Sequence, residues 1–413
     1  MNDTPRIRIV VSCALLAVAV TACTARNDRP LTPKAYDGAG PLTVSAPADG
    51  TKADPEKPLE ITAKGDGDRI ADVTALDAAG RHLAGELTAD GRRWRSTASL
   101  AAGTRYTVRV ATEDGEGAPG VRTFTFETTP AERALTADFG PEAGTYGVGQ
   151  PITADLSLPV KDRASRAVVE RALKVRSTPS VEGSWYWVDD KKLHFRPKEY
   201  WPAGARVTVS GNLDGLKIGD KLYGGASAPL KLTIGDRVEA IADAGSHHMT
   251  VKRNGEVINT IPVTTGKPGF STRNGTKVVL GKEYYVRMRG TTVGISEGSS
   301  ESYDLPVYYA TRVTWSGEYV HAAPWSVGSQ GVANVSHGCV GMSTGNAAWF
   351  FENVRPGDVV RTVNSDGDTM EPFGNGFGDW NLTWDKWRQG SALVETAGEP
   401  VVSTQKARLR PSL

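Results

Sequence analysis

The feature that most constrains the fold of this chain is a pattern of short alternating segments that recurs after about a hundred residues. Between residues 41 and 236, apolar and polar residues alternate over runs such as 106–110 and 123–127, and Gly, Pro and Asp separate the runs. A period of two is typical of half-buried β-strands. Residues 102–108 (AGTRYTV) recur 101 positions later as residues 203–209 (AGARVTV). Because an immunoglobulin-like sandwich has about this size, the pattern predicts two sandwiches in tandem.

The rest of the chain is also expected to be mainly β. Asn254-Gly255 lies between two alternating runs, which is a strong hairpin signal. Ser343 begins a stretch that is typical of a capped helix, and residues 163–175 predict a second helix. A length of 413 residues is too great for one core. We expect two sandwiches at 41–130 and 131–236, a third domain at 237–363, a C-terminal subdomain at 364–390 and a disordered tail at 391–413.

The N-terminus is typical of an exported lipoprotein. Two arginines within the first eight residues precede an apolar run at residues 9–20, and a small residue stands before Cys23. This pattern predicts a signal peptide at 1–22, lipidation of Cys23, and a flexible linker at 23–40 that is rich in Pro, Gly and charge. An ordinary cleaved signal and an uncleaved anchor are the alternatives, although the run is short for a spanning helix. We expect the protein on the extracytoplasmic face of the membrane, anchored by lipid.

Charge argues against one class of partner. The 48 basic and 47 acidic residues give a formal net charge of +1, and no basic cluster is interleaved with aromatic residues. Proteins that bind nucleic acid usually carry a basic patch. Nucleic acid is therefore not expected as a partner.

Cys339 is the candidate nucleophile. The other two cysteines, Cys13 and Cys23, both lie in the export segment, while His321 and His337 are close to Cys339 in the sequence. An imidazole can take the thiol proton and hold the thiolate as an ion pair. Amides at the start of the helix that follows would also favour the anion. The composition predicts acyl-transfer chemistry.

Two structural alternatives compete with a catalytic thiol. A lone cysteine is commonly a small buried apolar residue, but Cys339 lies in a loop rich in Gly, Ser and Asn. Zinc could be bound by His321, His337 and Cys339, but no fourth ligand and no paired-cysteine spacing is evident. We expect neither a metal nor a cofactor.

A family resemblance rests on His321, fourteen intervening residues, and then Ser336-His337-Gly338-Cys339. This spacing resembles the signature of the L,D-transpeptidases with a YkuD-type catalytic domain. Residues 320–327, 346–350 and 378–387 are similar to the actinobacterial branch, whose members carry a lipoprotein signal and immunoglobulin-like domains. The likeness covers essentially the whole mature chain. It implies two sandwiches followed by a β-rich catalytic domain with a short helix and a C-terminal cap.

The resemblance implies a mechanism. Cys339 would attack the carbonyl between the third and fourth residues of a peptidoglycan stem tetrapeptide and expel D-alanine. His321 would be the general base, oriented by a backbone carbonyl near Ala322. Amides of Gly338 and Cys339, with the Tyr303 hydroxyl, would bind the oxyanion. The amine of a second stem would resolve the thioester into a 3→3 cross-link, and β-lactams of the carbapenem type would acylate the same thiol.

The resemblance assigns the remaining site residues to supporting roles. His337 would shape the loop around the thiol, although it is also an alternative base. Substrate contacts are implied for Ser316, Gly317, Trp325, Ser336 and Gly341. The family usually has asparagine where this chain has Gly341. That departure predicts weaker substrate binding.

Two segments outside the motif are also interpreted. Residues 290–302 are rich in Gly and Ser, and we expect them to act as a lid over the site. Trp380, Trp384 and Trp387 share one helical face and predict a cap that packs on the catalytic domain.

Two functions of other classes stay open. A hydrolase, either an L,D-carboxypeptidase or a cysteine peptidase, would share the first half-reaction and let water resolve the acyl-enzyme. A non-catalytic wall-binding lipoprotein would keep the fold without turnover.

Overall fold

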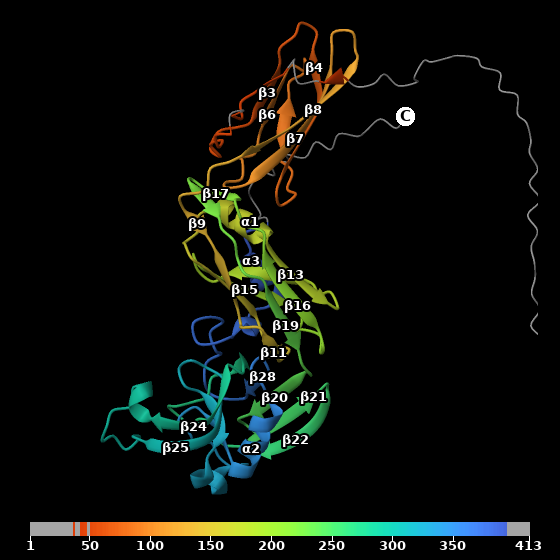
Figure 1. The fold of residues 1–413 in the computed structure, drawn as a ribbon. Coiled ribbons are helices and arrows are strands. Elements are labelled where there is room, and N and C mark those ends of the chain that lie inside the picture. Colours follow the sequence, from red (N-terminus) through yellow and green to blue (C-terminus); the bar gives the residue numbers. More distant parts are fainter. Residues whose placement is uncertain (1–35, 38–41, 48–49, 395–413) are drawn as a thin grey trace, which may run out of the picture.

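The computed structural model describes residues 36–37, 42–47 and 50–394. Its strands form three β-rich domains that follow one another along an elongated molecule (Figure 1). No helix within these residues is long and apolar enough to cross a membrane. The predicted signal peptide, Cys23, most of the linker and the tail from residue 395 lie outside the described residues.

The first domain is a sandwich of two four-stranded sheets. Alternation is clearest in β7, where every second residue from Tyr106 to Thr112 is buried while most of those between are exposed. Leu59, Ile61 and Val108 lie at the centre of its core. One sheet has the order β1-β8-β7-β4 and the other β2-β3-β6-β5. The strands are β1 (Tyr36–Asp37), β2 (Leu42–Val44), β3 (Glu60–Ala63), β4 (Arg69–Asp77), β5 (Gly85–Leu87), β6 (Arg93–Ser96), β7 (Arg105–Glu113) and β8 (Pro119–Glu127).

Two residues of the predicted linker belong to this sandwich. Tyr36 and Asp37 form β1 and pair in parallel with Gly120 and Val121 of β8. The edge of β8 offers backbone groups that a neighbouring segment can satisfy.

The second domain is a sandwich with one helix. Its two four-stranded sheets have the orders β10-β12-β15-β14 and β11-β19-β16-β13, and a small third sheet is β17-β18-β9. The strands are β9 (Ala134–Leu135), β10 (Ala137–Gly140), β11 (Gly144–Tyr146), β12 (Ile152–Leu156), β13 (Leu173–Thr178), β14 (Gly183–Trp187), β15 (Lys192–Pro197), β16 (Arg206–Gly211), β17 (Lys217–Gly219), β18 (Leu222–Gly224) and β19 (Leu230–Ile234).

The helix α1 (Arg163–Ala172) starts where the sequence predicts and ends three residues earlier than expected. Asp162 caps its N-terminus by accepting a hydrogen bond from the Ser165 amide at 2.8 Å. From Leu173 onward the backbone pairs with β16, and Val175 lies opposite Val209. Pairing with a neighbouring strand therefore decides where the helix stops.

The third domain has two sheets around a short helix. The five-stranded sheet has the order β22-β21-β20-β28-β23, and the four-stranded sheet is β24-β25-β26-β27. The expected hairpin is present, and Asn254 and Gly255 both adopt positive φ, at 51° and 91°. The elements are β20 (Val238–Asp243), β21 (His248–Arg253), β22 (Glu256–Pro262), β23 (Gly275–Val278), β24 (Gly281–Arg289), η1 (Gly290–Val293), β25 (Asp304–Arg312), β26 (Tyr319–Ala322), η2 (Pro324–Ser329), β27 (Val340–Met342), α2 (Thr344–Asn353) and β28 (Val359–Val363).

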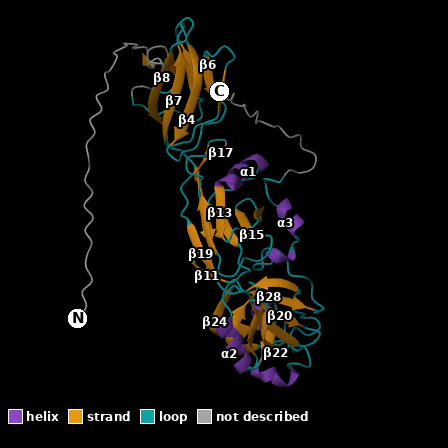
Figure 2. Ribbon diagram, turned by 90° about the vertical axis from the view of Figure 1, so that its right-hand side faces the viewer, coloured by secondary structure: helices purple, strands orange, loops and turns teal. Residues whose placement is uncertain are grey.

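The C-terminal cap is formed by η3 (Asp379–Asn381) and α3 (Trp384–Gln389). α3 packs on β14 of the second sandwich, whereas η3 contacts β23 of the third domain. The prediction that the cap packs on the catalytic domain is therefore wrong for α3. The Arg196 guanidinium of β15 lies over the rings of Trp380, Trp384 and Trp387, at 4.7, 5.5 and 4.7 Å from their centroids. Cations bind aromatic faces in this way, and Figures 1 and 2 place α3 beside this sandwich. The sequence assigned residues 391–394 to the disordered tail, but they continue along the second sandwich, where Ser391 and Ala392 bond Glu170.

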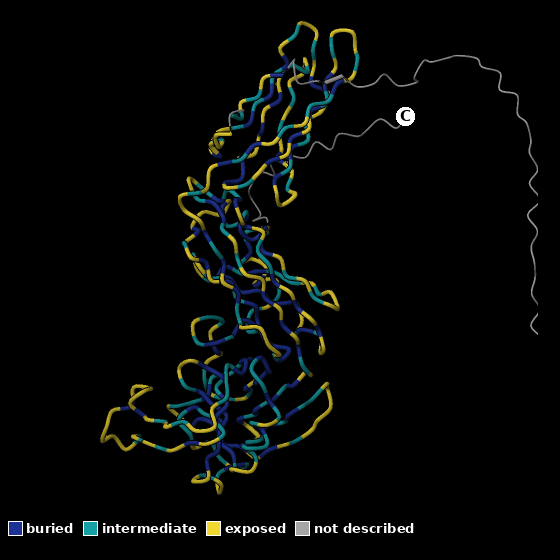
Figure 3. The backbone as a smooth tube through the Cα atoms, viewed as in Figure 1, coloured by how far each residue is buried: buried dark blue, intermediate teal, exposed yellow. Residues whose placement is uncertain are grey.

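The second and third domains share a close backbone interface. The amides of Gly147 and Gly149 donate to the carbonyls of Pro356 and Gly357, both at 2.9 Å. A Cβ atom at Gly147 would lie 2.2 Å from the Asp358 nitrogen, so only glycine permits this approach. Buried residues run through all three domains along the tube in Figure 3.

Candidate active site

Two neighbouring parallel strands bring the candidate base and nucleophile together. β26 pairs with β27 so that Val320 lies opposite Val340 and His321 lies opposite Gly341. Cys339 immediately precedes β27, at the end of a loop that begins with η2. The register therefore places Cys339 just before β27, next to the strand that carries His321.

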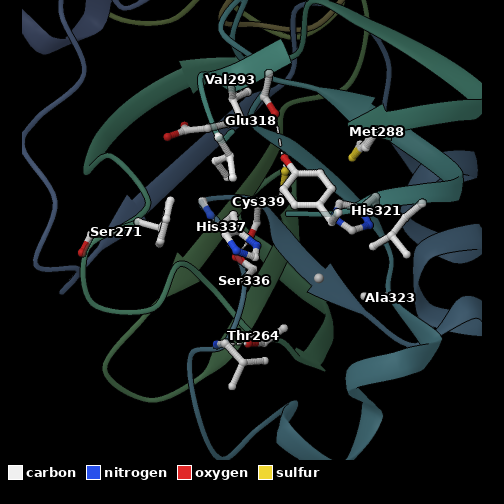
Figure 4. A pocket seen from close by; sticks show the side chains of 18 of the residues that line it. Thr264, Ser271, Met288, Val293, Glu318, His321, Ala323, Ser336, His337 and Cys339 are labelled. Atoms are coloured by element: carbon white, nitrogen blue, oxygen red, sulfur yellow. Dashed lines mark hydrogen bonds between the residues drawn. The ribbon is translucent and has the colours of Figure 1, made fainter. Parts of the chain in front are cut away.

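All ten residues that the sequence assigned to the site line one cavity of about 860 Å³. Figure 4 shows His321, His337 and Cys339 together at this cavity. Its other walls come from β24, β25, η1 and the loop before β23. The ten residues are Tyr303, Ser316, Gly317, His321, Trp325, Ser336, His337, Gly338, Cys339 and Gly341.

His321 has a defined tautomer. Its Nδ1 lies 2.8 Å from the carbonyl oxygen of Ala322, and a carbonyl can only accept, so Nδ1 carries the proton. Nε2 therefore has a free lone pair, as a general base requires. Burial lowers the pKa of His321, because the charged imidazolium loses its solvation. The ring is neutral at rest.

Cys339 is a protonated thiol at rest. Its Sγ–H donates to the carbonyl oxygen of Gly317 at 3.5 Å. Cys339 lines the cavity, but the packed walls of the cavity surround its sulfur. This burial raises the pKa of the thiol to about 12, because the thiolate would lose its solvation. This burial favours a neutral thiol beside a neutral imidazole over the thiolate–imidazolium pair that the sequence predicts. The expected help from the helix is wrong, because β27 separates Cys339 from the start of α2 at Thr344.

The loop before Cys339 is held by its own hydrogen bonds. Ser336 Oγ donates to the Cys339 carbonyl at 2.6 Å and accepts from the Gly338 amide at 3.1 Å. Thr272 Oγ1 donates to the Gly338 carbonyl at 2.8 Å. Gly338 has φ of 121°, which favours glycine. Because its amide already has a partner, Gly338 can bind an oxyanion only if Ser336 releases it.

The contacts of His337 do not favour a role as general base. Its Nε2 lies 2.7 Å from Glu301 Oε2, and its ring contacts the rings of Phe270 and Tyr303 at 4.7 and 5.0 Å. Glu301 belongs to the predicted lid, residues 290–302, and Lys267 also pairs with it. These contacts favour the supporting role. In the part of the chain that the structure describes, no three Cys, His, Asp or Glu side chains are grouped to hold a metal ion.

Gly341 and Trp325 differ in how they meet the cavity. Gly341 lies in β27 without a positive φ, and a Cβ there would lie 3.0 Å from Ala323 Cβ and 3.1 Å from Thr264 Cγ2. A side chain at position 341 would therefore require Ala323 and Thr264 to shift by a few tenths of an ångström. Trp325 is 52% exposed, and its ring centroid is 6.1 Å from that of His321. Trp325 is a wall of the cavity and not part of the core.

The sequence analysis missed an ion cluster beside the nucleophile. Glu318 Oε2 lies 2.7 Å from the buried Lys277 Nζ, and its Oε1 lies 3.0 Å from Arg273 Nη1. The one available signal was Lys277 itself, a charge within the otherwise uncharged strand β23. Glu301 was also missed, since nothing in a Gly- and Ser-rich segment marks one carboxylate as special.

Comparisons with known proteins agree with this geometry. Residues 237–362 match the L,D-transpeptidase catalytic domain (YkuD) family model, and residues 50–217 match the bacterial Ig domain model. L,D-transpeptidase 2 of Mycobacterium tuberculosis is 37% identical over 363 residues, which cover 88% of this chain and 85% of the relative. L,D-transpeptidase 5 of the same organism is 33% identical over 341 residues, covering 80% of this chain and 73% of the relative.

A solved structure of L,D-transpeptidase 3 from Mycobacterium tuberculosis, in complex with a faropenem-derived adduct, is also similar. It is 32% identical, covers 55% of this chain and 97% of its own, and has a TM-score of 0.46. The sequence relatives decide the assignment, because the first of them is matched over most of both chains. The chain belongs to the L,D-transpeptidase family of enzymes, with a catalytic domain preceded by immunoglobulin-like domains.

Proposed function

We propose that the protein forms 3→3 cross-links between peptidoglycan stem peptides through a thioester on Cys339, with release of D-alanine. One observation carries this proposal: the Ala322 carbonyl fixes the tautomer of His321, so that a basic Nε2 lies in the same cavity as the only cysteine of the described residues. Nucleophilic catalysis needs a base close to the thiol, and the pairing of β26 with β27 supports this arrangement.

The first half-reaction starts from neutral partners. As Cys339 Sγ attacks the carbonyl carbon of the third stem residue, His321 Nε2 takes the thiol proton. The tetrahedral oxyanion is bound by the Cys339 amide and the Tyr303 hydroxyl, with the Gly338 amide once Ser336 Oγ moves. His321 then gives its proton to the amide nitrogen, the C–N bond breaks, and D-alanine leaves.

The second half-reaction regenerates the thiol. The side-chain amine of a second stem attacks the thioester carbonyl, and His321 Nε2 accepts the amine proton. The C–S bond breaks, the sulfur regains a proton from His321, and a new amide joins the two stems. Thioesters react readily with amines, which favours this outcome over hydrolysis.

The N-terminal sequence pattern supports a location outside the cytoplasm. Lipid on Cys23 would hold the protein on the outer face of the cell membrane, facing the wall. Two domains of about 100 residues placed end to end extend roughly 70 Å, so the sandwiches would act as a spacer between membrane and active site. Carbapenem-type β-lactams would inhibit the enzyme by acylating Cys339.

Mass spectrometry of products from purified stem tetrapeptides tests the proposal. A cross-linked dimer and free D-alanine are expected when donor and acceptor are incubated with the enzyme. Trimmed monomers without dimers would instead identify a carboxypeptidase, and absence of any turnover would identify a wall-binding protein. The Cys339→Ala variant is the control, since it retains the cavity without the nucleophile.

A further inference from the structure

Arg273 is a half-exposed cation in the wall of the active-site cavity. It precedes β23, and its side chain is 43% exposed. Its Nη1 lies 3.0 Å from Glu318 Oε1 and 3.5 Å from Ser316 Oγ, and its backbone amide also donates to Glu318 Oε1 at 3.1 Å. Within the described part of the chain, Nε and Nη2 have no hydrogen-bond partner. One edge of the guanidinium is fixed and the other is available.

The cluster around Glu318 contains two basic side chains and one carboxylate, although burial lowers the pKa of Lys277. Lys277 Nζ is buried and bonds Glu318, the Arg273 carbonyl at 2.6 Å and Thr362 Oγ1 at 3.3 Å. Two cations therefore share one carboxylate, and only Arg273 can reach a ligand. Two other carboxylates that line the cavity, on Asp366 and Asp368, are exposed and pair with neither cation.

The ion cluster adjoins the residue that contacts the nucleophile. Glu318 and Ser316 flank Gly317, whose carbonyl accepts the hydrogen bond from Cys339 Sγ at 3.5 Å. Arg273 and Cys339 line the same cavity, and Arg273 contacts both neighbours of Gly317. A donor bound with its scissile carbonyl at Cys339 has a leaving residue that ends in a carboxylate, which is the kind of group that a guanidinium in this wall can bind.

We propose that Arg273 binds the terminal carboxylate of the acyl donor, on the D-alanine that the reaction expels. This inference rests on the proposed function. The Nε–Nη2 edge of a guanidinium matches the two oxygens of a carboxylate, and such charged pairs are stronger than neutral hydrogen bonds. Arg273 thereby selects donors that end one residue after the scissile bond, because a longer peptide has a neutral amide at that position.

The test compares two donors and two enzymes. The donors are a stem tetrapeptide with a free D-alanine carboxylate and the same peptide with a terminal carboxamide, and the readout is kcat/KM for formation of the acylated product. The wild type should prefer the free acid by about 10- to 100-fold, the usual weight of a charged hydrogen bond. Arg273→Gln should lose that factor on the free acid and little on the carboxamide.

The two donors separate recognition from structure. If Arg273→Gln loses activity equally on both donors, Arg273 only holds Glu318 in place and the inference is wrong. If the wild type uses both donors at equal rates, the inference is wrong but the proposed function is unaffected. Failure of the wild type to acylate with either donor would overturn the proposed function and this inference with it. Arg287→Gln is the matched control, because Arg287 pairs with Asp304 outside the cavity lining and should keep the preference.

Discussion

His321 donates its Nδ1 proton to the carbonyl oxygen of Ala322 at 2.8 Å, and this bond decides which ring nitrogen can act as a base. The carbonyl belongs to the next residue of the same strand, so the orientation needs no second side chain. Serine proteases use an aspartate for this purpose. Here the backbone of β26 provides the acceptor.

Replacing His321 by Ala should slow acylation of Cys339 by roughly 10² to 10⁴ fold, the usual effect of a positioned base. The measurement is the rate of a carbapenem mass adduct on the intact protein. Cys339→Ala should show no adduct at all. If His337→Ala is slower than His321→Ala, the base has been assigned to the wrong histidine.

The resting thiol predicts a particular pH dependence. Burial raises the pKa of Cys339 to about 12 and lowers that of His321, so both groups are neutral near pH 7. The rate of alkylation by iodoacetamide should therefore keep rising as the pH increases from 7 to 10. A plateau below pH 7 would show that a thiolate–imidazolium pair exists after all.

A side chain at position 341 should be harmful. Gly341→Asn places a Cβ about 3 Å from Ala323 Cβ and Thr264 Cγ2, and overpacking of this kind typically costs about 1–3 kcal/mol of unfolding free energy. Gly341→Ala should show part of this loss, since it adds the Cβ alone. Thermal denaturation measures both. If the Gly341→Asn variant instead has unchanged stability and a lower KM, steric crowding does not limit this position. That result would support the prediction that glycine here weakens substrate binding.

Asp358 should make stability depend on pH. Its carboxyl is fully buried at the interface with the second sandwich, and this burial raises its pKa to about 7, with Arg355 and Arg253 opposing the shift. Because the folded pKa lies above the unfolded value, the carboxyl favours folding below pH 4, and this contribution is lost as the pH rises through 7.

Denaturant unfolding at pH 4.5 and 7.5 checks the contribution of Asp358. The wild type should lose more free energy of unfolding over this interval than Asp358→Asn, by an amount on the order of a few kcal/mol. Equal losses would mean that the carboxylate is adequately solvated when folded.

Removal of residues 36–130 tests the spacer. The first sandwich contributes no residue to the cavity lining, so the shortened enzyme should keep full activity on soluble stem peptides while forming fewer cross-links in intact cells. Loss of activity on soluble peptides would make the first sandwich part of the folding unit.

The sequence predicted elements whose signals are local. The alternation of β7, the Asn254-Gly255 turn and the cap at Ser343 are all present. The end of α1 was missed because pairing of residues 173–178 with a strand thirty residues away decides it. The packing of α3 on the second sandwich was missed for a similar reason, since Arg196 is distant in sequence from the tryptophans that it contacts.

The site residues that belong to or align with the family motif were predictable from the sequence. All ten residues line one cavity, because the motif residues surround a single parallel strand pair. Arg273, Lys277 and Glu318 were not predictable, since their meeting depends on how β23 and the turn before β26 pack. The protonation of Cys339 was also missed, because the sequence does not indicate how closely the walls of the cavity surround the sulfur.

The joint between the second sandwich and the catalytic domain has a consequence for evolution. Asn381 of the cap bonds the backbone of Thr276, only three residues from Arg273, at 2.7 and 3.0 Å, while neighbouring Trp380 donates to the Gly149 carbonyl at 2.8 Å. A gene fragment that encoded only residues 237–363 would leave that strand without its support. Recombination that exchanges the first sandwich has fewer constraints, but it must still replace contacts with the second sandwich such as the Ala102 amide on the Gly215 carbonyl at 2.8 Å.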